Sequence, residues 1–317
     1  MGGSHQRASI TQKESQSLSL PLNDDDDLQL QYQTMRKPGK AAVFLAQTIT
    51  IMMRAWKAKI NQPLSIILPI MATLMVSLLI AFTWFQIERV PSSANAYYRV
   101  LTLQAFYFTI ATISTCCTIF NKDRKEILPC AKGAVRFPAA PVWFGRYLAD
   151  LPLRMALVLL ASLIVYPISR LRPGAQYFLL YQLGLLLQAA GNTAAGMCCS
   201  AVTANPSVAT WLAIFLVLFN YLFSATIYTQ TRVTWILRWL RYVAVTFYAN
   251  QTSIFSQFKG ATYPGYAVTG DDILNATGWL KVPVAISISG GIWMILFFNL
   301  VGPIILHSTT RCSLRNG

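Results

Sequence analysis

Long stretches without a charged residue are the feature that most constrains how this chain can fold. Only 12% of the 317 residues are charged, against roughly a quarter in an ordinary soluble domain. The charge-free windows are 64–85, 100–120, 155–169, 173–231 and 282–310. A helix needs about 20 apolar residues to cross the hydrocarbon core of a bilayer. The sequence therefore predicts an all-α integral membrane protein.

The longest window predicts two helices rather than one. It runs for 59 residues, from Pro173 to Thr231, and contains Asn205-Pro206. Proline removes a backbone donor and ends the preceding helix. The short window 155–169 reaches full length only when 148–154 is added, which places Asp150 and Arg154 near one membrane interface. Six spans result, at about 64–85, 100–120, 148–169, 177–201, 207–228 and 282–306.

Two segments flank this six-helix domain, which we place at 63–310. Residues 1–40 are rich in Ser, Gln and Asp and predict a disordered tail, and a second tail covers 311–317. Residues 41–62 carry apolar side chains at steps of three and four, which predicts an amphipathic helix along the membrane surface. A seventh buried helix is less favoured, because Arg54, Lys57 and Lys59 would lie in lipid.

The segment before the last span alternates aromatic and basic residues. Trp235, Arg238, Trp239, Arg241 and Tyr242 favour an outer re-entrant or interfacial helix, with its rings at the depth of the lipid headgroups. The same segment holds two sequences of the N-glycosylation type. They begin at Asn250 and Asn275, and we favour Asn275 because its neighbours are more polar.

The net charge of +15 is explained by membrane topology rather than by nucleic-acid binding. Sixteen Lys and Arg residues fall on the side that holds both termini, and nine fall on the other side. Cytoplasmic loops are the ones that carry the excess of Lys and Arg. We therefore expect both termini in the cytoplasm. The expected location of this multi-pass protein is the plasma membrane.

The residues predict no catalytic, metal or cofactor site. Gly39-Lys40 lacks the glycine and hydroxyl residue of a phosphate-binding loop, and the spans hold no pair of carboxylates. The missing deep carboxylates also disfavour an ion-coupled carrier or channel. The adjacent cysteines 116–117 and 198–199 point in different directions on a helix, so we interpret them as small residues at helix contacts. Gly191 and Gly196 have the same interpretation.

Neutral polar residues follow one face of two predicted spans. By helical spacing, Gln104, Phe108, Ala111 and Thr115 share a face of the second span. Asn220 and Ser224 share a face of the fifth span. Such groups need hydrogen-bonding partners in lipid, so they contact either another helix or a substrate. From the residues alone, helix contact is the favoured alternative.

Four motifs, in order, resemble one known family. They are the segment 119–126, the segment 143–152 with Tyr147, Asp150 and Pro152, the segment 205–209 beginning Asn-Pro, and Phe223-Ser224-Ala225 followed by Trp235, Trp239 and Tyr242. From about Phe44 to the last span, the chain resembles the membrane domain of the ABCG, or White, subfamily of ABC transporters.

The resemblance implies a type-2 exporter fold in which two membrane domains face each other. It implies a substrate path lined by Gln104, Phe108, Ala111, Thr115, Ile214, Val217, Leu218 and Tyr221. It also implies a gate at Thr226 and Ile227. The loop 121–146 would couple to the ATPase through Asp123, Arg124, Lys125 and Glu126. Ala225 and Thr118 depart from the family pattern, where Gly and Glu are usual.

The resemblance further implies that ATP and Mg lie on a partner rather than on this chain, since 40 residues of tail cannot hold an ATPase domain. The expected partner is an ABC ATPase subunit or an ABCG half-transporter, in a homodimer or heterodimer. The expected function is outward movement of a lipid, sterol or xenobiotic. The alternative is a truncated relative that does not transport and instead regulates or scaffolds a full transporter.

Overall fold

The structure is a computed structural model that describes residues 40–120, 138–224, 239–263, 265–278 and 283–315. The chain divides after Leu45 into two units, 1–45 and 46–317. Of the first unit, only the beginning of α3 is described. The described helices are α3 (Lys40–Ile60), α4 (Leu64–Thr83), α5 (Ala94–Cys116), α7 (Ala139–Ile168), α8 (Ala175–Val202), α9 (Pro206–Phe223), α10 (Val245–Phe258), α11 (Gly270–Thr277) and α12 (Val284–Arg315).

The predicted fold class is confirmed. A long helix occupies the position of each predicted span, and α3 occupies that of the connecting helix. Within the described residues, five helices are long and apolar enough to cross a membrane, judged by length and composition alone: α4, α7, α8, α9 and α12. The sixth, α5, has 23 residues but is more polar, with Asn95, Arg99 and Gln104 along its length.

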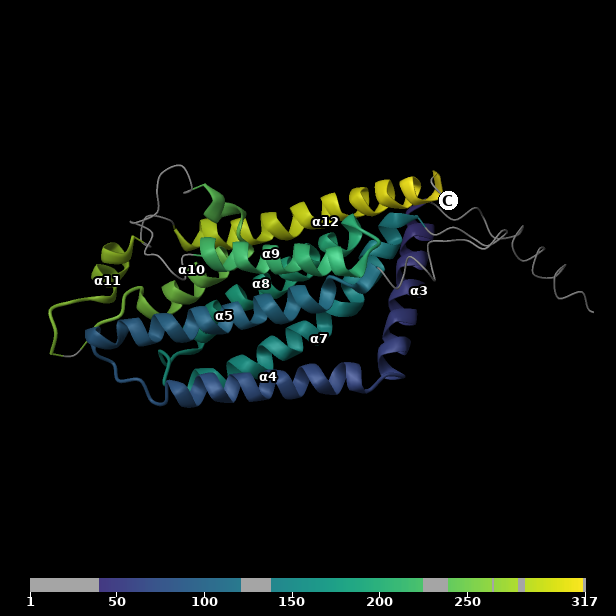
Figure 1. Cartoon of the computed structure of the whole chain (residues 1–317). Coiled ribbons are helices and arrows are strands. Elements are labelled where there is room, and N and C mark those ends of the chain that lie inside the picture. The colour runs from purple at the N-terminus through teal and green to yellow at the C-terminus, as the bar shows by residue number, and fades with distance from the viewer. Residues whose placement is uncertain (1–39, 121–137, 225–238, 264, 279–282, 316–317) are drawn as a thin grey trace, which may run out of the picture. The chain divides into compact units, whose positions relative to one another are not determined.

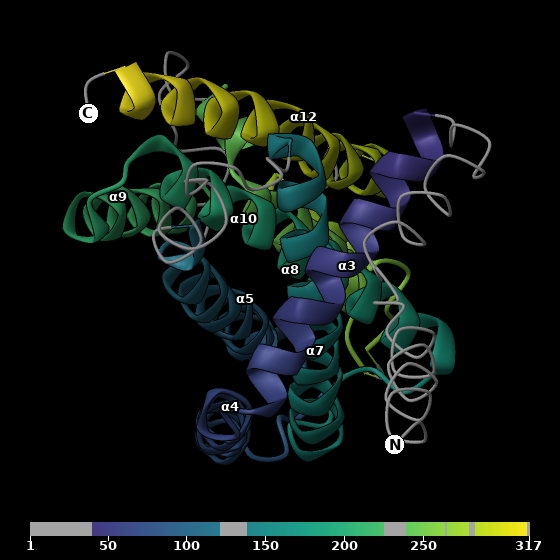
Figure 2. The ribbon, with the colours of Figure 1, turned by 90° about the vertical axis from the view of Figure 1, so that its right-hand side faces the viewer.

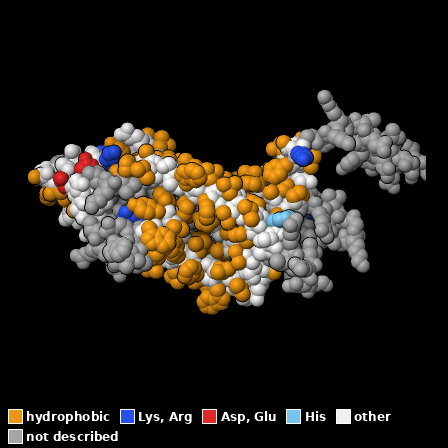
Figure 3. All heavy atoms as spheres, turned by 90° about the horizontal axis from the view of Figure 1, so that it is seen from above, with side chains coloured by type: hydrophobic (Ala, Val, Ile, Leu, Met, Phe, Trp, Pro, Cys, Tyr) orange, Lys and Arg blue, Asp and Glu red, His pale blue; other side chains and the backbone are white. Residues whose placement is uncertain are grey.

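The long helices of the second unit lie side by side, with α4 and α12 on opposite edges (Figures 1 and 2). Helix α8 is central: 83% of its most apolar window is buried, and it packs on α5, α7, α10 and α12. Hydrophobic side chains gather along the face over α9 and α12, while charged side chains lie toward its ends (Figure 3). This distribution suits lipid around the middle of the bundle.

Local sequence explains where α8 stops and α9 begins. Asn205 is the N-cap of α9, and its side-chain oxygen accepts a hydrogen bond from the Ser207 amide at 3.0 Å. Pro206 occupies the first helical position, where its missing N–H costs nothing. The break predicted inside the 59-residue window is therefore present.

Glycine allows α8 to approach α5 closely. A Cβ atom on Gly196 would lie 2.8 Å from the Cβ atom of Cys116 and 3.1 Å from the backbone of Ile113. These distances are too short for any larger residue without displacement of α5. The interpretation of Gly196 and Cys116 as helix-contact residues is confirmed.

Helix α10 is buried. Every residue from Val245 to Phe258 except Tyr248 is buried, and the helix packs on α5, α8, α9 and α12. Of the two forms expected before the last span, this burial fits the re-entrant one and not an interfacial helix. Trp239 and Tyr242 precede it at a short 3-10 turn, η3 (Leu240–Val243), while Trp235 and Arg238 lie outside the described residues.

Neutral side chains provide hydrogen-bond partners for the polar groups at the buried start of α10. The Oδ1 atom of Asn220 on α9 accepts hydrogen bonds from the backbone amide and the hydroxyl of Thr246, both at 3.2 Å. The Thr246 hydroxyl lies 2.8 Å from that of Thr109 on α5. Gln188 on α8 donates to the Thr109 hydroxyl at 2.8 Å. Four helices are thus joined through four side chains and one backbone amide, which confirms that Asn220 is a helix-contact residue.

We expect Asn220→Ala to lower the free energy of unfolding by about 1–3 kcal/mol, because it leaves the Thr246 amide buried without an acceptor. Thermal or chemical unfolding of the purified protein in detergent measures this loss. Thr210→Ala on the same helix is the control, since Thr210 is exposed and its hydroxyl donates to the Pro206 carbonyl one turn earlier. Equal stability of the two variants would contradict the assigned role.

Candidate functional site

A cavity of about 530 Å³ lies between α4, α5 and α7, at the end of the bundle where α3 joins α4. The second half of α5 and the first halves of α4 and α7 form its walls, and Lys59 at the end of α3 contributes to its rim. Apolar and hydroxyl side chains cover most of the lining, including Leu68, Ala72, Thr73, Tyr107, Phe108, Ala111, Leu153 and Leu157.

Charged groups lie at the rim of this cavity. Lys59 forms an ion pair with Asp150 of α7, and its ammonium also donates to the Ala149 carbonyl at 3.3 Å. The Asp150 residue is only 7% exposed, so the lysine supplies the partner that a buried carboxylate requires. Arg154, one helical turn further along α7, donates from Nη2 to the Thr115 hydroxyl at 2.8 Å.

The inner part of the cavity is apolar with few polar atoms. The hydroxyls of Thr73 on α4 and Tyr107 on α5 lie 3.1 Å apart and join the two walls. Phe108 and Ala111 complete this part. A cavity with an apolar interior and a charged rim suits a compound that is itself amphipathic.

Three of the four residues predicted on the polar face of α5 line this cavity: Phe108, Ala111 and Thr115. Gln104 does not. It is 1% exposed, and its Oε1 accepts a hydrogen bond from the Tyr181 hydroxyl of α8. The alternative of helix contact therefore describes Gln104, whereas its three neighbours have access to the cavity.

The predicted residues of α9 lie away from this cavity. Ile214 and Leu218 are exposed, at 44% and 52%. Val217 packs on the small cluster formed by Ile113 and other buried residues. The Tyr221 ring lies 4.3 Å from the ring of Phe106, measured between centroids.

Sequence reasoning missed two contacts, one at the site and one beside it. Phe106 contacts Tyr221, and it lies on a different face of α5 from Phe108. Lys59 and Asp150 were placed near the membrane surface but not paired with each other. A signal was present, since Asp150 is the only carboxylate within the six predicted spans and Lys59 lies just before the first of them.

Two groups of predicted residues lie outside the described residues. The coupling residues Asp123, Arg124, Lys125 and Glu126 belong to the undescribed 121–137. The gate residues Thr226 and Ile227 belong to the undescribed 225–238. Both assignments therefore stay predictions.

The two glycosylation candidates differ in exposure. Asn250 is fully buried in α10, and its amide donates to the Ser224 carbonyl at 3.3 Å. The folded protein has no room for a glycan there, so the suggestion of Asn250 is corrected. Asn275 is exposed on α11.

Comparison with known proteins agrees with this architecture. Residues 46–258 match the family described as ABC-2 type transporter. The chain is 24% identical over 251 residues to the broad substrate specificity ATP-binding cassette transporter ABCG2 of Sus scrofa, an alignment covering 75% of this chain and 38% of that one. It is 23% identical over 226 residues to Protein white of Ceratitis capitata, covering 69% and 32% of the two chains.

These alignments cover only about a third of the length of the curated relatives. The family match, over residues 46–258, includes the helices that form the cavity. The resemblance to the ABCG subfamily is confirmed, and the chain belongs to the ABC-2 type transporter family of multi-pass integral membrane proteins.

Proposed function

We propose that the chain is the membrane permease of an ABC exporter that moves a hydrophobic or amphipathic compound of the lipid, sterol or xenobiotic class outward. The observation that carries this proposal is the amphipathic cavity between α4, α5 and α7 in a chain of this family. Its volume of about 530 Å³ falls within the range of small-molecule sites. ATP hydrolysis takes place on a partner chain, which also holds the Mg.

A second membrane domain, from a homodimer or heterodimer, faces this one in our proposal. The exposed apolar side chains of Ile214 and Leu218 on α9 support such a contact. Asp123 to Glu126 couple this domain to the ATPase, and Thr226 and Ile227 form the gate. The excess of Lys and Arg on one side supports cytoplasmic termini, and we place the protein in the plasma membrane.

We expect Ala111→Phe to reduce substrate flux on the order of tenfold, because the new ring overpacks the cavity and occupies the space that the substrate would need. The measurement is ATP-driven uptake of a fluorescent amphiphile into inside-out vesicles that contain this chain and a candidate ABC ATPase. Ile110→Phe is the matched control, since Ile110 is 40% exposed and does not line the cavity.

The same assay separates transport from scaffolding. Equal flux with the two phenylalanine variants would contradict substrate passage through this cavity. If the rate of transport by the partner is the same with the Ala111→Phe variant as with the unmutated chain, then this chain acts as a regulator or scaffold. Loss of flux with intact binding of the ATPase supports the permease function.

The proposed topology places Asn275 outside the cell. We expect the protein expressed in animal cells to carry a glycan that peptide N-glycosidase removes, and Asn275→Gln to abolish that shift in electrophoretic mobility. Asn250→Gln is the control for the mobility shift and should leave it unchanged, because Asn250 is buried. A shift that persists in Asn275→Gln, or that is absent from the unmutated chain, would count against this placement of α11.

A further inference from the structure

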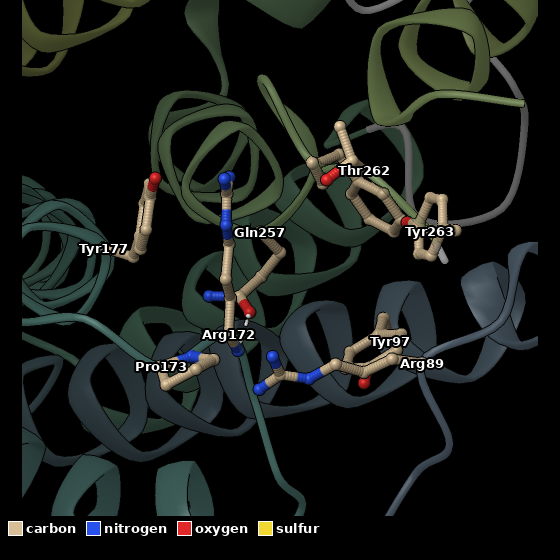
Figure 4. A pocket seen from close by; sticks show the side chains of 10 residues that line it. Arg89, Tyr97, Arg172, Pro173, Tyr177, Gln257, Thr262 and Tyr263 are labelled. Carbon is tan, nitrogen blue, oxygen red and sulfur yellow. Dashed lines mark hydrogen bonds between the residues drawn. The ribbon is translucent and has the colours of Figure 1, made fainter. Parts of the chain in front are cut away.

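A second cavity lies at the other end of the bundle, away from the junction of α3 and α4. Its volume is about 560 Å³, and it lies among the loops that join α4 to α5, α7 to α8 and α10 to α11. Arginines and tyrosines form much of its lining: Arg89, Tyr97, Arg172, Tyr177 and Tyr263, together with Gln257 (Figure 4). None of the described residues that line it is acidic.

Arg172 is held in place by the end of α10. Its Nη1 donates to the Lys259 carbonyl at 2.6 Å and its Nη2 to the Gly260 carbonyl at 2.9 Å. The guanidinium also stacks on the Tyr177 ring, 3.8 Å from the ring centroid. Two of its five N–H groups are used in these bonds, so a fixed positive group with further donors lines the cavity.

Arg89 brings a second guanidinium to the same cavity. Its Nη2 donates a hydrogen bond to the Leu171 carbonyl at 3.2 Å. Arg89 is exposed. It also donates a hydrogen bond to the Tyr97 hydroxyl, and its remaining donors are available to a ligand. In Figure 4 its side chain lies beside Tyr97, below the space between Arg172 and Tyr263.

Aromatic side chains give this cavity firm apolar walls. Tyr97 is 6% exposed, and its ring meets that of Phe258 edge-on at 6.3 Å between centroids. Gln257 is fixed as well, since its Oε1 accepts from the Arg172 amide at 2.7 Å. The walls are therefore already ordered, and a ligand would not have to bear the entropy of ordering them.

We propose that this second cavity binds a phosphate group carried on a ring or another apolar body. Guanidinium groups bind phosphate through paired, charge-assisted hydrogen bonds, and the tyrosine rings provide a surface for the body of the ligand. The phosphate belongs either to a membrane lipid headgroup or to a soluble phosphate ester. This site goes beyond the proposed transport function and does not depend on it.

The test compares ligands with and without phosphate on the purified full-length chain in dodecyl maltoside. Phenyl phosphate is paired with phenol, and phosphatidic acid is paired with diacylglycerol of the same acyl chains. The readouts are the shift in melting temperature and the apparent Kd. Arg89→Gln is the test variant, Arg89→Lys is the conservative variant, and Arg99→Gln is the control, because Arg99 is exposed nearby and does not line the cavity.

We expect a phosphate ligand to stabilise the unmutated chain and its neutral partner to have no effect. Arg89→Gln should weaken that binding roughly tenfold or more, the effect of losing a charge-assisted hydrogen bond. Arg89→Lys should recover part of the affinity, and Arg99→Gln should bind normally. The ligand pair that shows the dependence on Arg89 identifies the source as lipid or soluble ester. Equal binding by Arg89→Gln and Arg99→Gln, or no preference for phosphate in either pair, would overturn the proposal.

Discussion

The hydrogen bonds from Thr246 to Asn220 are the interaction on which much of the bundle depends. They provide an acceptor for the polar groups at the start of α10, a helix that begins inside an apolar environment. No water is present there to replace a missing hydrogen-bond partner. Only a side chain from another helix can do this, so α9 and α10 must pack together. The requirement extends to α5 and α8, because Thr109 and Gln188 complete the same network. Helix α5, which is more polar than the five apolar helices, supplies Thr109 to this network.

Small residues on α8 make room for this buried helix. A Cβ atom on Gly191 would lie 2.7 Å from Val245, at the first turn of α10. A Cβ atom on Gly184 would lie 3.0 Å from Thr252, two turns later. Helix α10 can therefore lie directly against α8, and van der Waals packing replaces the hydrophobic driving force that lipid does not provide. Close packing and satisfied polar groups support each other here, since the hydrogen bonds of Thr246 are short only while α10 stays in this position.

The sequence was sufficient for what depends on composition and helical period. Charge-free windows and Asn205-Pro206 predicted the long helices, since lipid makes the position of charges decisive. The sequence was not sufficient to predict the surroundings of a side chain where these depend on which neighbouring helix its face contacts. Gln104 and Ala111 share a face by spacing, yet one contacts Tyr181 and the other lines a cavity, because neighbours differ along α5. The sequence also left open whether the helix before the last span is re-entrant or interfacial, since its polar residues have no visible partners until Asn220 and Ser224 are placed beside it.

Helix α3 contacts the helix α7 that forms one wall of the cavity between α4, α5 and α7. Lys59, at the end of α3, pairs with Asp150 at the rim of the cavity. Earlier in α3, Ile51 packs against Gly145 of α7, where a Cβ atom would come within 2.9 Å of it. The two contacts lie on the same stretch of α7, so a displacement of α3 must either break the ion pair or carry the first half of α7 with it. Breaking the pair would leave a buried carboxylate without its partner, which is costly. Movement of α7 together with α3 is the less expensive response, and α7 forms one wall of the cavity.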